Sequence, residues 1–67
     1  MKYYSIIIHE CGKWSPTLTT LNTNRLKVEE QYGLWLKDGY STNNAKIITT
    51  VKNSMPEVQK ECDRLSN

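Results

Sequence analysis

The longest apolar run of the chain lies near its start. Residues 2–9 contain Tyr3, Tyr4 and three consecutive isoleucines. Aromatic and β-branched side chains fit the pleated surface of a sheet. Because the centre of this run is apolar on both faces, it predicts a strand in the middle of a sheet rather than at its edge.

The residues that follow predict a hairpin. Residues 10–13 form a turn, in which Gly12 can adopt a positive φ at no steric cost. Residues 14–21 are rich in threonine and leucine and are expected to return as a second strand. Pro16 has no N–H to donate, so this strand has to lie at the edge of the sheet or break there.

Residues 23–38 allow two interpretations. In the first, Val28, Tyr32 and Trp35 recur at three- and four-residue steps and share one face of a helix, which Thr23 or Asn24 would cap. In the second, an alternating set reads as strands, and Asp38-Gly39 would make a hairpin turn; the set is Leu26, Val28, Tyr32, Leu34 and Leu36. We favour the helix, although a glycine in its interior costs about 1 kcal/mol relative to alanine.

The last third of the chain predicts a strand and then a helix. Residues 45–52 carry five β-branched residues in succession. Ser54 and Glu57 have the spacing of a capping box, and the proline between them suits the first turn of a helix. An apolar stripe then recurs at helical spacing, made of Met55, Val58, Cys62 and Leu65.

The order strand, strand, helix, strand, helix predicts an α+β fold. We expect a small two-layer sandwich in which both helices pack on one face of a mainly antiparallel sheet. If residues 23–38 are strands, the alternative is a five-stranded sheet with one C-terminal helix. A chain of 67 residues is expected to form a single domain, residues 1–67.

Charge and composition narrow the class of protein. The net charge is +2, with nine basic and seven acidic residues interspersed, whereas nucleic-acid binders usually cluster their basic residues. No apolar run is long enough to cross a membrane, so no membrane partner is expected. A cytoplasmic location is the expectation, and there both cysteines would be free thiols. Frequent Lys, Asn, Ile and Tyr have A/T-rich codons and suggest a low-GC bacterium or its phage as the source.

Residues 9–11 are the tripeptide with the densest chemistry. His9, Glu10 and Cys11 offer metal-ligand and nucleophile types. A structural zinc site needs four ligands, and the spacings typical of such sites are absent from the sequence. A cysteine nucleophile needs a base and a third group that orients the base, and the sequence assigns no such third group. We therefore expect no catalytic residue, no metal, no cofactor and no enzymatic activity.

Two turns carry aromatic and basic residues together. Lys13 and Trp14 lie at the expected hairpin. Lys37 and Tyr40 flank the expected turn at Asp38-Gly39. Tryptophan is enriched among the residues that dominate binding energy at protein interfaces. The sequence therefore favours a non-enzymatic protein-binding module that occupies a partner's surface, such as an accessory or inhibitor protein of a phage or mobile element.

Two alternatives remain. Lys2, Lys46 and Lys52, with neighbouring tyrosines, could form a basic sheet face, which would indicate a small nucleic-acid-binding regulator. A homodimer is the third alternative, because the core is small and a strand edge is available.

Overall fold

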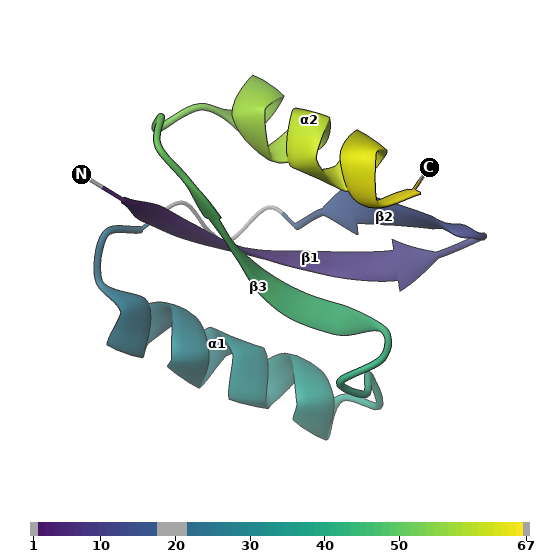
Figure 1. Cartoon of the computed structure of the whole chain (residues 1–67). Coiled ribbons are helices and arrows are strands. Elements are labelled where there is room, and N and C mark those ends of the chain that lie inside the picture. The colour runs from purple at the N-terminus through teal and green to yellow at the C-terminus, as the bar shows by residue number, and fades with distance from the viewer. Residues whose placement is uncertain (1, 18–21, 67) are drawn as a thin grey trace.

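The computed structural model describes residues 2–17 and 22–66. These residues form a three-stranded antiparallel sheet and two helices, with β1 at the centre of the sheet in the order β2-β1-β3 (Figure 1). The α+β class, the order of the elements and the central place of the first strand are thereby confirmed. The elements are β1 (Tyr3–Glu10), β2 (Lys13–Pro16), α1 (Arg25–Lys37), β3 (Ala45–Thr50) and α2 (Met55–Ser66).

The second strand is shorter than predicted. The sequence indicates residues 14–21, whereas β2 ends at Pro16. As the missing N–H of proline requires, β2 is an edge strand. Residues 18–21 of the predicted strand lie outside the described residues.

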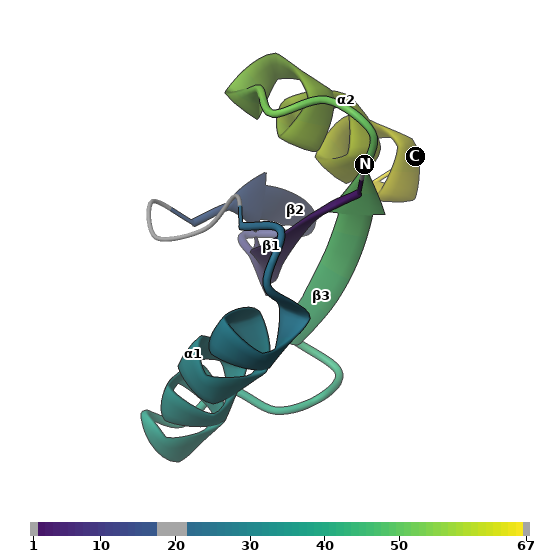
Figure 2. The same ribbon diagram turned by 90° about the vertical axis from the view of Figure 1, so that its left-hand side faces the viewer.

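The two helices cover opposite faces of the sheet. Figures 1 and 2 both place α2 on one side and α1 on the other, with the strands between them. Successive side chains of a strand point to opposite faces, so Ile7 faces α2, while Ile6 and Ile8 face α1. All three are buried, with exposed fractions of 0, 0 and 9%.

The core on the α2 side is a cluster of four buried residues. Its members are Ile7, Ile48, Val58 and Cys62, and the half-buried Trp14 and Leu65 pack against it. The stripe predicted for the last helix therefore reaches the core through Val58, Cys62 and Leu65, whereas Met55 is exposed.

The core on the other side is thinner. Val28 is the buried residue of α1, and Tyr32 donates a hydrogen bond from its hydroxyl to the carbonyl oxygen of Ala45, 2.6 Å away. Because helices occupy both faces, the molecule has three layers, and the predicted two-layer arrangement is wrong. The physical reason is the apolar run of β1, which presents isoleucine to both faces and so needs cover on both.

Residues 25–37 are helical, which excludes the alternative of a five-stranded sheet. The side chain of Asn24 accepts a hydrogen bond from the N–H of Leu26 at 3.1 Å and so caps the helix. The chain leaves α1 through Gly39, whose φ of 114° suits glycine. At α2, Ser54 accepts backbone bonds from Glu57 and Val58 through its carbonyl oxygen.

Candidate functional site

The hairpin turn between β1 and β2 is tight. Cys11 and Gly12 both have positive φ, at 53° and 79°, so the predicted use of Gly12 is confirmed and Cys11 shares the conformation. Turns of this kind match the right-handed twist of the two strands that they join. Glu10 and Lys13 face each other across the turn, and both are exposed. Lys13 is therefore presented to solvent.

Trp14 has a different environment from Lys13. Its ring lies edge-on to the ring of His9, with centroids 5.1 Å apart, and the Nζ of Lys46 is 5.0 Å from its centroid. Its backbone N–H donates to the Oγ of Ser66 at 2.9 Å. Since the ring also packs against the core cluster, Trp14 links β2 to α2 and is only half-exposed.

The loop after α1 lies beside the hairpin turn. Tyr40 donates a hydrogen bond from its hydroxyl to the carboxylate of Glu10. Its ring packs edge-on against Trp35, with centroids 5.2 Å apart. The bond to Glu10 raises the pKa of Tyr40, and desolvation and the negative charges of Glu10 and Asp38 act in the same direction. We call the residues of these two adjacent turns, Glu10–Lys13 and Lys37–Tyr40, the turn surface.

The basic residues of the nucleic-acid alternative do not share an open sheet face. Lys2 and Lys52 are exposed and flank the paired residues Tyr3 and Thr50, at one end of the sheet. Lys46 lies further along β3, where its side chain reaches Trp14. In the described part of the chain, α1 and α2 cover the two faces of the sheet, on which bases would have to stack (Figure 2).

The chemistry of residues 9–11 is divided among three environments. His9 packs on Trp14, Glu10 binds Tyr40, and Cys11 is an exposed free thiol in the turn. Cys62 is a free thiol in the core, where burial raises its pKa and the carboxylates of Asp63 and Glu61 add to the effect. Within residues 2–17 and 22–66, no three His, Cys, Asp or Glu side chains are grouped so as to hold a metal ion.

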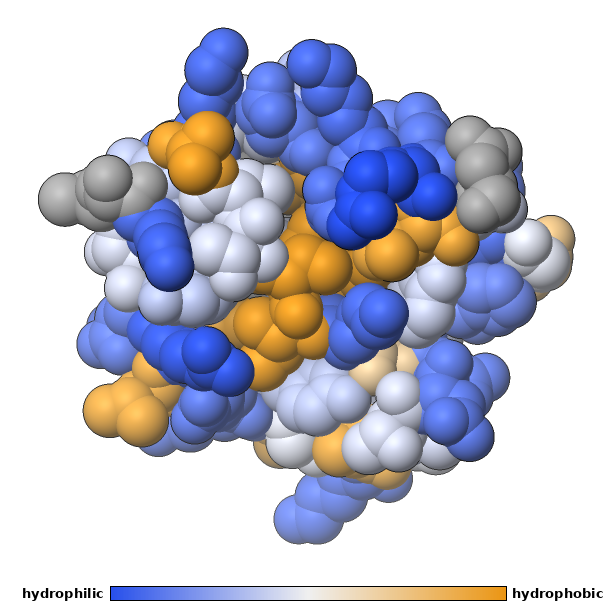
Figure 3. Space-filling view, in the orientation of Figure 1, coloured by the Kyte–Doolittle hydropathy of each residue, from blue (hydrophilic) through white to orange (hydrophobic). Residues whose placement is uncertain are grey.

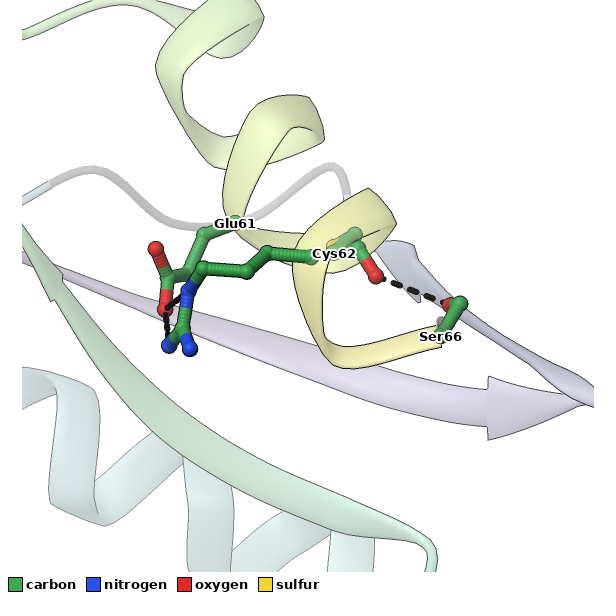
Figure 4. Close-up of polar contacts among 4 residues, drawn as sticks. Glu61, Cys62 and Ser66 are labelled. Carbon is green, nitrogen blue, oxygen red and sulfur yellow. Dashed lines mark hydrogen bonds and ion pairs between the residues drawn. The ribbon is translucent and has the colours of Figure 1, made fainter.

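A hollow of about 380 Å³ lies between α2 and the end of β3. Two of its lining residues form an ion pair: Arg64 donates to the carboxylate of Glu61, and this contact lowers the pKa of Glu61 (Figure 4). Sequence reasoning missed the hollow, because the charged residues of α2 have the spacing of an ordinary solvated helix face. Its lining residues are Thr49, Thr50, Val51, Glu57, Lys60, Glu61 and Arg64.

Comparisons with protein-family models, with curated proteins and with solved structures found no match to this chain. None of the helices among the described residues has the length and apolar character needed to cross a membrane. The function therefore has to be inferred from the chain's own residues.

Proposed function

We propose that this chain is a small, non-enzymatic protein-binding module that acts by occupying a partner's surface. The observation that carries the proposal is the hydrogen bond from Tyr40 to Glu10, which joins two turns about 30 residues apart in the sequence into one turn surface. Two regions that the sequence marks separately thereby become a single contact area.

The turn surface is held in place before any partner arrives. Tyr40 is anchored by Glu10 and by the ring of Trp35, and the hairpin turn is only two residues long. A rigid surface loses little conformational entropy on binding, so more of the contact energy is available as affinity. Lys13 and Lys37 are exposed here and would steer an acidic partner.

The mechanism is steric, because a surface that covers a partner's site needs no chemistry of its own. An accessory or inhibitor protein of a phage or mobile element would act in this way. The nucleic-acid alternative has less support, since the helices cover both faces of the sheet.

The test is affinity capture from the lysate of a low-GC bacterial host, with and without nuclease. We expect one dominant protein that survives nuclease treatment. The double variant Lys13→Glu/Lys37→Glu should lose it, because two positive charges of the turn surface become negative. Lys27→Glu is the control for a single charge reversal, since Lys27 is equally a surface lysine but lies in the first turn of α1, away from the loop.

Trp14→Ala is a poor probe of this surface, because it also removes packing against the core cluster. Capture that disappears with nuclease would replace the proposal with nucleic-acid binding. Equal capture by the double variant and by the wild type would show that the partner binds elsewhere.

A further inference from the structure

The two edges of the sheet differ in their free hydrogen-bonding groups. Along β2, the register with β1 directs the backbone groups of Trp14 and Pro16 outward. The N–H of Trp14 is taken by the Oγ of Ser66, and Pro16 has no N–H. The edge at β2 therefore offers no free donor among the described residues. We call this edge closed, because a further strand would find only carbonyl acceptors there.

The edge at β3 is open. The N–H of His9 donates to the carbonyl oxygen of Asn44 at 2.6 Å, and this bond sets the alternation along the ladder. The backbone groups of Lys46, Ile48 and Thr50 therefore bond to β1, and those of the residues between them point outward. Ala45 is already satisfied, because its N–H bonds to Ser41 and its carbonyl accepts from Tyr32.

Ile47 and Thr49 therefore carry the outward groups that remain. Within the described part of the chain, no partner contacts the N–H or C=O of either residue. Figure 2 shows α1 set off from the outer side of β3, whereas α2 lies over the end of the strand. There the charged side chains of α2 border the hollow that Thr49 lines.

We propose that a second copy of this chain pairs antiparallel with β3 across this edge. In the register that we infer, Ile47 of each copy faces Thr49 of the other, and the two Ile48 residues face each other on the two-fold axis. The pairing makes four backbone hydrogen bonds, and these satisfy every outward N–H and C=O of Ile47 and Thr49 in both copies. The edge is thus complementary to itself.

The side chains along the edge of β3 are compatible with pairing to a second copy. Residues 47–51 are β-branched and uncharged, and Val51 is 74% exposed. The register places Lys46 opposite Thr50 of the second copy, so no like charges meet across the strands. Figure 3 shows this side of the molecule, where hydrophobic side chains gather across the middle and hydrophilic ones lie around them.

The closed edge at β2 explains why association would stop at two copies. Pairing through β3 makes one six-stranded sheet with a β2 strand at each end, and those ends accept no further strand. The result is a closed two-fold dimer rather than a fibre. Because the β3 strands run antiparallel, the two turn surfaces lie at opposite ends of the dimer.

The first test is sedimentation equilibrium of the wild-type protein from about 1 μM to about 1 mM, a range that spans weak and moderate affinities. We expect the mass to rise from monomer to dimer and no further. Thr49→Pro should raise the dissociation constant of the dimer by about tenfold or more, since it removes two of the four bonds and leaves carbonyls unpaired. Its fold should persist, because this N–H points away from β1.

Thr49→Val is the matched control, since it keeps the N–H and nearly the same shape, and it should dimerise like the wild type. The register has its own test in a Cys11→Ser/Cys62→Ala background, which also removes the thiol that packs beside Ile48. Ile48→Cys should form an intermolecular disulfide under mild oxidation, because residues facing each other in a non-hydrogen-bonded pair have Cα atoms about 4.5 Å apart. Thr49→Cys should not, because its counterpart lies on the far side of the two-fold axis.

A wild-type protein that stays monomeric at about 1 mM would overturn the proposal, whatever the variants do. Masses beyond the dimer would also overturn it, because the edge at β2 would then be in use. Dimers that survive Thr49→Pro, or that crosslink through Thr49→Cys and not through Ile48→Cys, would place the interface or its register elsewhere.

Discussion

Burial differs sharply among the apolar residues of this chain. Ile7 is fully buried and contributes to the cluster on the α2 side, whereas Leu26 and Leu34 of α1 are 71% and 54% exposed. A small domain has a free energy of unfolding of only a few kcal/mol, so the few buried residues determine whether the chain folds.

Removing one methyl group from Ile7 tests how much a buried residue contributes to stability. Ile7→Val should lower the free energy of unfolding by about 0.5–1.5 kcal/mol, because the change removes buried contacts and leaves a small cavity. Urea denaturation followed by circular dichroism measures the difference. Leu26→Ala is the control and should change it by less than about 0.5 kcal/mol. Equal losses in the two variants would show that the core lies elsewhere.

The raised pKa of Tyr40 predicts that the stability of the fold depends on pH in the alkaline range. Its pKa in the folded chain is raised above the ordinary value of 10.0, first by its bond to Glu10. A raised pKa means that the fold favours the neutral phenol, so this stabilisation is complete below pH 10 and is lost as the pH rises through the raised pKa.

The measurement compares the wild type with Tyr40→Phe by thermal unfolding across this pH range. The wild type should be the more stable at neutral pH, and its advantage should shrink at alkaline pH. A difference that stays constant with pH would contradict the assigned role of the hydroxyl.

Among the elements, α1 buries fewer residues than α2. Val28 is its buried residue, and its interior contains Gly33. The helix nevertheless forms, because Asn24 caps its start and Tyr32 ties it to β3. Tertiary contacts of this kind outweigh a weak intrinsic preference for helix.

Gly33→Ala should therefore stabilise the protein. A Cβ atom at this position would meet nothing within 4 Å, and the backbone there is helical. Alanine is favoured over glycine in helix interiors by about 0.5–1 kcal/mol, and this is the expected gain in the free energy of unfolding. Chemical denaturation measures it. Gly39→Ala is the contrast and should destabilise, because φ at Gly39 is 114°.

At the scale of the whole molecule, three thin layers share a central strand. Each face of β1 supports one helix, and neither half of the core is large. A second copy joined at β3 would add contacts to this small fold, and any ligand that binds only the folded state raises its apparent stability by mass action.

The midpoint of thermal unfolding should therefore increase with protein concentration. Calorimetry of the wild type at several concentrations measures this, with Thr49→Pro as the variant whose midpoint should change less with concentration. A wild-type midpoint that does not change with concentration would contradict dimerisation at those concentrations.

Local patterns in the sequence were sufficient to predict most elements. Pro16 indicated an edge strand, and the spacing of Val28, Tyr32 and Trp35 indicated a helix, since both signals act within a few residues. The layers were predicted wrongly, because periodicity shows that a helix has an apolar side but not which face of the sheet it covers. The hollow beside α2 was missed because its charged residues have the spacing of an ordinary solvated helix face.

The candidate site likewise combines features that the local sequence predicts with features that depend on the tertiary structure. Lys13 and Tyr40 could be selected from the sequence because they accompany turns, but their grouping depends on a bond between Glu10 and Tyr40 across the fold. The sequence predicts Trp14 as a contact residue, whereas the structure shows it packed between β2 and α2. Whether an aromatic residue faces a partner or its own core depends on what packs over it, which the local sequence does not contain.

The class of the fold, the order of its elements and the central place of β1 follow from short-range periodicity and backbone chemistry, so the sequence predicts them. The opposite placement of the helices, the joining of two distant turns into one surface, and the difference between the open edge at β3 and the closed edge at β2 do not follow from local patterns. Each of these depends on contacts between residues far apart in the chain, such as Trp14 with Ser66. Such contacts form only when the packed core brings the elements together.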